Sequence, residues 1–249
     1  MAGVLALTAA CTARSGSDSS DTAARQRTPP AGTTAASPAK SPTHSPTRSP
    51  ADPAADRDLL GAARSGATDS VRDAIERGAD PETRDEHGRT PLLLAVTGDH
   101  VAAAGILVKA GADPDALDRR HDTPWLVTGV TGSAAMARTL AAAHPDYTVV
   151  NRYGGTSLIP ASERGHVDYV REVITNPEID IDVNHVNNLG WTALLEAVIL
   201  GDGGQAHQKV VELLLDAGAD RSLSDRNGVS PLQHAQQKGY TEIARMLRG

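Results

Sequence analysis

Residues 188–199 read N-L-G-W-T-A-L-L-E-A-V-I, and residues 86–97 read E-H-G-R-T-P-L-L-L-A-V-T. Both stretches place a Gly two residues before a Thr and follow the Thr with leucines and an Ala. A Gly accepts the positive φ of a tight turn, and a Thr hydroxyl can cap the N-terminus of a helix. The two stretches therefore predict that one turn-and-helix unit occurs more than once in this chain.

The spacing of these signatures gives the length of the unit. The Thr or Ser that opens the predicted helix recurs after 33, 33, 36 and 38 residues, at Thr90, Thr123, Thr156, Thr192 and Ser230. A second signature, G-A-D, begins at Gly78, Gly111 and Gly218. The first two copies of G-A-D are also 33 residues apart. The chain thus repeats with a period of 33 residues that lengthens toward its C-terminus.

A 33-residue period with T-P-L, G-H and G-A-D signatures resembles that of the ankyrin repeat family. The resemblance covers residues 58–249 and implies an all-α solenoid of about six repeats, each a helix-turn-helix with a β-hairpin loop. One unit cannot bury its apolar face alone, so neighbouring units must stack. The expected units are an N-terminal cap at 58–85, repeats at 86–118, 119–151, 152–187 and 188–225, and a C-terminal cap at 226–249.

Individual residues allow a local interpretation of each unit. Thr90 is expected to cap an inner helix that has Pro91 in its first turn. Gly111 is expected to end an outer helix in a left-handed conformation. Trp125 takes the Leu position of T-P-L, so we expect it in the core.

The third unit departs most from the repeat pattern. His121 replaces the turn Gly, and Thr128 and Gly129 replace the usual Ala pair. A His at a positive φ is strained, and we interpret this unit as a degenerate repeat of lower local stability. Insertions at residues 176–182 and 201–206 lengthen the next two units, and their aspartates lack the spacing of an EF-hand calcium loop.

The only cysteine, Cys11, follows the short apolar run M-A-G-V-L-A-L-T-A-A. This run resembles the lipobox of bacterial lipoproteins, in which the Cys becomes the lipidated first residue of the mature protein. Thr8 stands where that motif has Leu, and ten residues without a basic group are too few for a signal peptide. A start codon assigned too late would explain both departures. Residues 1–11 are interpreted as a signal peptide with its lipidation site, the alternative being an Ala-rich N-terminus without such a role.

Residues 12–57 are rich in Ser, Thr, Ala and Pro and hold almost no large apolar residue. Such a composition cannot bury enough surface to offset the entropy of ordering, so it predicts a disordered linker. Ser-Pro recurs there every four residues, at Ser37, Ser41, Ser45 and Ser49. A tract of this kind favours extended polyproline II and acts as a spacer. After a lipidated Cys11 it would hold the repeats away from a membrane.

Charge is distributed unevenly along the chain. Residues 12–57 hold six of the 24 Lys and Arg and four of the 31 Asp and Glu, which leaves 18 basic and 27 acidic groups elsewhere. An acidic body is a poor partner for nucleic acid, and the sequence has no run of about 18 apolar residues to span a bilayer. We therefore expect no nucleic-acid partner, and membrane contact only through a lipid anchor at Cys11.

The sequence contains no H-E-x-x-H, G-x-S-x-G, C-x-x-C or P-loop motif. His100, His166 and His207 fall at the G-H position of the family, which implies bonds to nearby backbone rather than a metal site. Glu163 and Glu196 leave a hydrolase as one alternative, which requires a cleft that brings the two carboxylates within about 10 Å. We expect a protein without enzymatic activity, cofactor or metal.

The resemblance implies that a concave groove, formed by hairpin tips and inner helices, is the functional surface. In this family the contact positions flank the turn Gly and the end of the inner helix. Arginines and large aromatics occupy several of these positions, and such residues commonly anchor protein interfaces. The predicted partner-binding residues are Arg89, Arg119, Arg120, Asp122, Arg152, Tyr153, Arg164, Leu189, Trp191 and Arg226. The alternative is that these side chains are ordinary solvated hairpin tips.

These observations predict a non-enzymatic module that binds a protein partner through its groove. We expect a bacterial envelope protein, lipid-anchored through Cys11 to the outer face of the cytoplasmic membrane, with a secreted or a cytoplasmic protein as alternatives. A stoichiometric regulator or inhibitor of an envelope enzyme is the alternative function. We expect a monomer.

Overall fold

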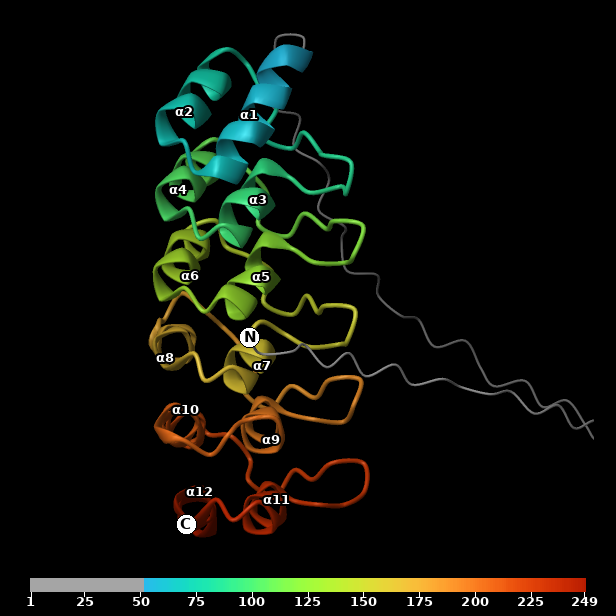
Figure 1. Ribbon diagram of the computed structural model, residues 1–249, viewed down its shortest axis with the longest axis vertical. Helices are drawn as coiled ribbons and strands as arrows, with labels where there is room; N and C mark the ends of the chain where they lie inside the picture. The colour runs from blue at the N-terminus through green and yellow to red at the C-terminus, as the bar shows by residue number, and fades with distance from the viewer. Residues whose placement is uncertain (1–51) are drawn as a thin grey trace, which may run out of the picture. The chain divides into compact units, whose positions relative to one another are not determined.

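The computed structural model describes residues 52–249, in which twelve α-helices and no strand are found. The lipobox-like segment 1–11 with Cys11, and the linker as far as residue 51, lie outside the described residues. The helices form six pairs stacked along one axis, and the hairpin loops all project from the same side of the stack (Figure 1). The predicted all-α ankyrin-like solenoid is therefore confirmed for the described part of the chain.

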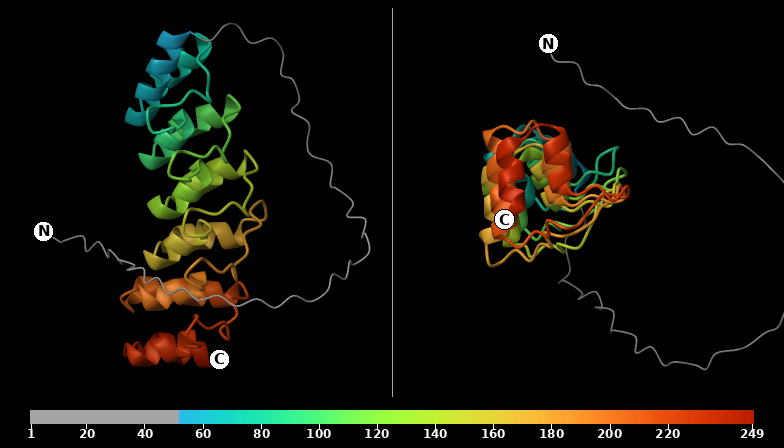
Figure 2. Two further views of the ribbon diagram at one scale, coloured as in Figure 1. Left: turned by 90° about the vertical axis from the view of Figure 1, so that its right-hand side faces the viewer. Right: turned by 90° about the horizontal axis from the view of Figure 1, so that it is seen from below.

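Each pair consists of an inner helix, which lies beside the hairpin loops, and an outer helix behind it (Figure 2). The inner helices are α1 (Pro53–Ser65), α3 (Pro91–Thr97), α5 (Pro124–Thr131), α7 (Leu158–Glu163), α9 (Ala193–Ile199) and α11 (Pro231–Gln237). The outer helices are α2 (Thr68–Glu76), α4 (Val101–Lys109), α6 (Ala134–Ala141), α8 (Val167–Thr175), α10 (Gln205–Asp216) and α12 (Thr241–Arg248). None of these helices is long and apolar enough to cross a membrane.

A continuous core runs through the stack because each inner helix packs on the next inner helix and each outer helix on the next outer helix. The core is built from Ala, Val and Leu side chains of every unit, such as Leu59, Leu92, Leu158 and Leu194. Trp125 is fully buried, which confirms its predicted core position. Burial in each layer depends on the adjacent units, so stability is shared between neighbours.

The first helix begins earlier than the sequence interpretation placed the domain. Residues 53–57 were assigned to the linker, but they form the first turns of α1, and Ala55 is fully buried. The physical reason is an N-terminal cap: Asp52 Oδ1 accepts a hydrogen bond from the Ala54 N–H at 2.9 Å, and Pro53 occupies the first helical position. The cap falls within an Ala, Pro and Asp composition that resembles the linker, which is why composition alone misplaced the boundary.

The predicted capping and turn residues behave as expected. Thr90 Oγ1 accepts a hydrogen bond from the Leu93 N–H at 3.3 Å, at the N-terminus of α3. Gly111 has a φ of 86° just beyond α4, which confirms the left-handed end of that helix. His121 has a φ of 63° in the third hairpin, so an imidazole does occupy the backbone conformation that usually selects Gly.

The unusual pair in the third unit is explained by its contacts with the fourth. A Cβ added to Gly129 would lie 1.8 Å from the backbone oxygen of Ser157, so only a Gly allows α5 and the start of α7 to approach this closely. Thr128 Oγ1 donates to the Trp125 carbonyl at 2.6 Å and lies 2.7 Å from the buried Tyr169 hydroxyl. Because the Thr128 proton is already used, Tyr169 donates in this second bond. The departures from the repeat pattern are therefore matched across the junction.

Aromatic side chains at the start of four outer helices, α4, α8, α10 and α12, tie their units to the preceding ones. The Nε2 atoms of His100, His166 and His207 donate to the carbonyl oxygens of Arg64, Val130 and Glu163 at 3.1, 3.3 and 2.9 Å. Tyr240 takes this position in the last unit, and its hydroxyl donates to the Gly201 carbonyl at 2.8 Å. The predicted structural role of these three histidines is confirmed, and the loop at 201–206 supplies the acceptor for Tyr240.

Candidate functional site

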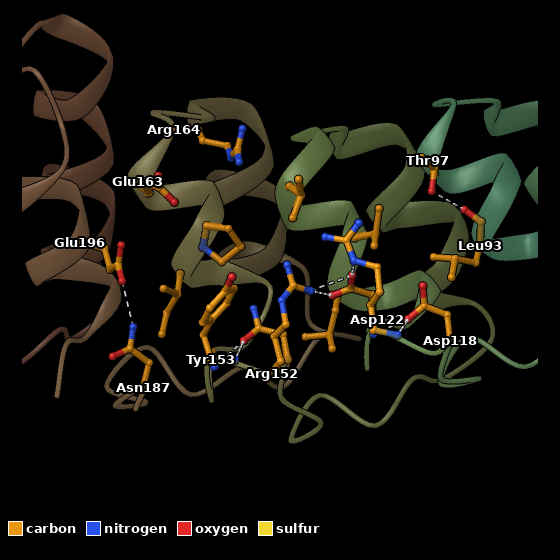
Figure 3. A pocket seen from close by; sticks show the side chains of 18 of the residues that line it. Leu93, Thr97, Asp118, Asp122, Arg152, Tyr153, Glu163, Arg164, Asn187 and Glu196 are labelled. Carbon is orange, nitrogen blue, oxygen red and sulfur yellow. Dashed lines mark hydrogen bonds and ion pairs between the residues drawn. The ribbon is translucent and has the colours of Figure 1, made fainter. Parts of the chain in front are cut away.

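A groove of about 840 Å³ runs along the side of the stack from which the hairpins project. Its floor comes from the inner helices α3, α5, α7 and α9, and its edge comes from the hairpins that precede them (Figure 3). The stacking of equivalent helices places the same repeat position of successive units side by side. Residues that are 33 to 36 positions apart in the sequence thereby form one surface.

The hairpins that form the edge share one anchoring arrangement. A side-chain oxygen of the first hairpin residue accepts hydrogen bonds from the N–H groups two and four residues later, at 2.7–3.1 Å. These anchoring residues are Asp85, Asp118, Asn151, Asn187 and Asp225. Each anchor satisfies two backbone donors that would otherwise lack a partner, so it fixes the direction in which the tip side chains project.

Arg89 is held against its own hairpin by an ion pair. Its Nη2 and Nε atoms lie 2.7 and 2.9 Å from Asp85 Oδ2. Burial would raise the pKa of Asp85, but hydrogen bonds from the Arg89 side chain and from backbone N–H groups outweigh it and lower the pKa to about 2. At this end of the groove the arginine charge is therefore already matched by a carboxylate.

Asp122 forms ion pairs with two further arginines. The Arg152 Nη1 atom lies 3.1 Å from Asp122 Oδ2, and the Arg120 Nε atom lies 3.8 Å from it. The Arg152 guanidinium also stacks over the ring of Tyr153, 4.7 Å from its centroid. Stacking and ion pairing together hold a flat aromatic surface open to the groove, because Tyr153 remains 59% exposed.

At the other end of the groove, two carboxylates lie on adjacent inner helices. Glu163 ends α7, and Glu196 lies in the middle of α9 with only 5% of the residue exposed (Figure 3). The Asn187 amide donates to Glu196 Oε1 at 2.9 Å, so the hairpin anchor also positions this carboxylate. Burial and the negative charge of Glu163 raise the pKa of Glu196 to about 7.

Family models match most of the region that forms this stack. The model described as ankyrin repeats in three copies matches residues 125–225 and 181–249, and the single ankyrin repeat model matches residues 87–119. The chain belongs to the ankyrin repeat family.

Ankyrin proteins of known sequence or structure resemble this chain over most of their length. The ankyrin repeat protein YahD of Escherichia coli (strain K12) is 39% identical over 190 residues, which cover 76% of this chain and 94% of YahD. An ankyrin repeat domain of Acinetobacter baumannii AYE is 44% identical, with a TM-score of 0.72 and coverage of 76% and 95%. The ankyrin repeat protein EF0377 is 36% identical, with a TM-score of 0.73 and coverage of 78% and 97%. Ankyrin repeats are protein-interaction modules, so this chain has a binding fold.

Most of the predicted contact residues meet in the ankyrin groove. Those that line it are Arg89, Arg119, Arg120, Asp122, Arg152, Tyr153, Arg164 and Leu189. Trp191 and Arg226 do not line it: Trp191 is partly buried, and Arg226 Nη2 donates to the Asn188 carbonyl at 2.5 Å and braces the neighbouring hairpin.

The sequence interpretation missed two features of the groove. It counted arginines as a basic surface, but Arg89 and Arg152 are paired with hairpin aspartates that lie 4 and 30 residues away. It also gave no role to Asn187, which holds both its hairpin and Glu196. The sequence held no clear signal for this role, because Asn151 takes the same anchor position in the preceding unit. Within residues 52–249, no group of three His, Cys, Asp or Glu side chains is arranged to hold a metal.

Proposed function

We propose that this chain is a non-enzymatic adaptor that binds one protein partner along the ankyrin groove. The observation that carries the proposal is the exposed apolar surface gathered there. Val130, Tyr153, Leu189 and Leu200 are among the large apolar side chains that remain exposed in the described residues, and all four line the groove. Exposed apolar side chains that share a groove with fixed polar groups are characteristic of a protein-binding surface.

We propose further that the adaptor is displayed from the bacterial envelope, anchored through a lipid on Cys11. The support comes from the sequence: an apolar run of small residues before the only cysteine, and then a Ser-Pro spacer. A lipid anchor at Cys11 followed by a spacer of about 40 residues would let the groove reach a partner near the membrane surface. Inhibition of an envelope enzyme would be one consequence of such binding if the partner is that enzyme.

A hydrolase is a weaker candidate, although Glu163 and Glu196 do line one groove. Glycosidase chemistry places its acid and its base or nucleophile on either side of a scissile bond. Here the two carboxylates come from successive helices of the same wall (Figure 3). This placement suits recognition of a positive charge better than cleavage of a bond.

Site-specific crosslinking in bacterial cells tests the groove. A photoreactive residue replaces Tyr153 in the groove of the full chain, and a matched variant carries it in place of Arg171 on the outer helix α8. We expect position 153 to capture one protein reproducibly and position 171 not to capture it. Equal capture at both positions would remove the case for the groove.

Fractionation of the same cells tests the anchor. We expect the wild-type chain in the membrane fraction. Cys11→Ser should move it to the soluble fraction. If the wild type is soluble as well, the envelope part of the proposal is wrong, while the groove assignment is unaffected.

A further inference from the structure

Two glutamates without an ion pair in the described part of the chain line the groove on α7 and α9. Among the described residues, neither the Glu163 nor the Glu196 carboxylate forms an ion pair. Glu196 accepts one hydrogen bond, from the neutral Asn187 amide, and interacts unfavourably with the charge of Glu163. Arg164, next to Glu163 in the chain, is exposed and forms no ion pair with either glutamate.

Two arginines that line the groove, in contrast, are neutralised within the fold. Arg89 and Arg152 have carboxylates of the same fold beside them, Asp85 and Asp122. At the α7–α9 end, Glu163 and Glu196 form no ion pair within the described residues, and the exposed Arg164 beside them bonds to neither carboxylate. A buried carboxylate beside a like charge is costly, and an external cation that contacts both would relieve that cost.

Apolar side chains flank the two carboxylates. Leu200 follows Glu196 by four residues at the end of α9, so the two share a helix face. Leu189 lies two residues beyond Asn187, the hairpin anchor that holds Glu196. Both leucines are about half exposed and line the groove. A long aliphatic stem that ends in a positive charge matches this combination, and Lys and Arg are the side chains of that form.

We propose that the α7–α9 end of the groove binds a lysine or arginine side chain of the partner, with its charge between Glu163 and Glu196 and its stem against Leu189 and Leu200. This inference rests on the proposed function and specifies the partner for it: a protein segment in which a basic residue stands beside large apolar residues. Tyr153 and its stacked Arg152 form the next contact along the groove. A basic side chain is complementary to Glu163 and Glu196, because neither carboxylate forms an ion pair within the described residues.

Selection from a peptide library tests the chemistry without a known partner. A phage-displayed library of random 12-residue peptides is selected on the full wild-type chain, and the affinities of the recovered peptides are measured by titration. We expect a Lys or Arg next to a large apolar residue in the recovered sequences. Glu163→Gln with Glu196→Gln should weaken their binding at least tenfold, whereas Glu212→Gln on the outer helix α10 should not change it. The side-chain amide introduced by Glu196→Gln can still accept the Asn187 hydrogen bond, so unfolding curves should show that the double variant is folded.

The possible outcomes separate the inference from the proposed function. Some peptides could bind the wild type and fail to bind the Tyr153→Ala variant. If these peptides carry no basic residue, or bind the Glu163→Gln, Glu196→Gln double variant as tightly as the wild type, the inference is overturned and the groove remains the binding site. Peptides that are indifferent to Tyr153→Ala would overturn both proposals. Failure to recover any peptide that binds the wild type would also count against both.

Discussion

Tyr169 and Tyr153 belong to the same ankyrin unit but have opposite surroundings. Tyr169 lies on α8 and is fully buried, and its hydroxyl lies 2.7 Å from Thr128 Oγ1 of the third unit. Tyr153 stands in the groove, exposed, with Arg152 over its ring. The Thr128 and Tyr169 hydroxyls at the junction of the third and fourth units bond to each other, whereas the ring of Tyr153 in the groove is held in place and left exposed. We infer that the junction serves stability and the groove serves binding.

Gly129→Ala should have the largest effect on the stability of the junction between the third and fourth units. The new methyl group would meet the backbone oxygen of Ser157 at 1.8 Å, and a backbone atom cannot move aside cheaply. We expect the free energy of unfolding to fall by about 3 kcal/mol or more, as measured by urea denaturation.

Gly105→Ala is the matched control for that substitution. Gly105 also lies within a helix, but its nearest atom to an added Cβ is Thr139 Cγ2 at 3.8 Å, an ordinary contact. This variant should be about 0.5–1 kcal/mol more stable than the wild type because Ala favours helix over Gly. If the two variants cost the same, the close approach of α5 and α7 is not what Gly129 provides.

Glu196→Gln should alter the dependence of stability on pH. The folded pKa of Glu196, about 7, lies above its ordinary value of 4.5, so the folded state binds more protons in this window. The contribution of Glu196 to stability is therefore present below about pH 4.5 and is lost as the pH rises through 7. We expect the wild type to lose on the order of 1–2 kcal/mol relative to the Gln variant between pH 5 and pH 8. Parallel pH profiles of the two proteins would contradict the burial of an ionisable Glu196.

Tyr169→Phe should have a smaller effect on the junction. The change removes one buried hydrogen bond. It leaves Thr128 Oγ1 without its donor, because Thr128 itself donates its proton to the Trp125 carbonyl. We expect a loss of about 1 kcal/mol in the free energy of unfolding. Tyr153→Phe, at the exposed tyrosine of the same unit, should leave stability unchanged to within about 0.5 kcal/mol. Equal losses at the two tyrosines would remove the distinction between junction and groove.

The repeat spacing was sufficient to predict the helix pairs, the caps such as Thr90, the buried Trp125 and the roles of the three histidines. These depend on positions that recur, and each copy supports the others. The close approach at Gly129, the Thr128–Tyr169 bond across 41 residues and the Asn187–Glu196 pair could not be predicted in this way. Each occurs at one place in the stack, and each depends on which side chains meet in space rather than on the period.

The predicted contact set shows the same limit. Position in the repeat identified Arg120, Arg152 and Tyr153 as groove residues because equivalent positions line one surface. It could not distinguish them from Trp191 and Arg226, which occupy similar positions beyond the groove. It also could not reveal that Asp122 contacts two arginines, since pairing of long side chains depends on geometry that a count of charges does not contain.

The central claim is that groove side chains are present to bind a partner and not to hold the fold. The most direct test is the free energy of unfolding of Arg120→Ala with Tyr153→Ala, measured together with capture of the partner that crosslinking identifies, by affinity pulldown on the same double variant. We predict a change in unfolding free energy within about 0.5 kcal/mol together with loss of partner capture. A loss of about 2 kcal/mol or more in stability, or full partner capture by the double variant, would contradict the account.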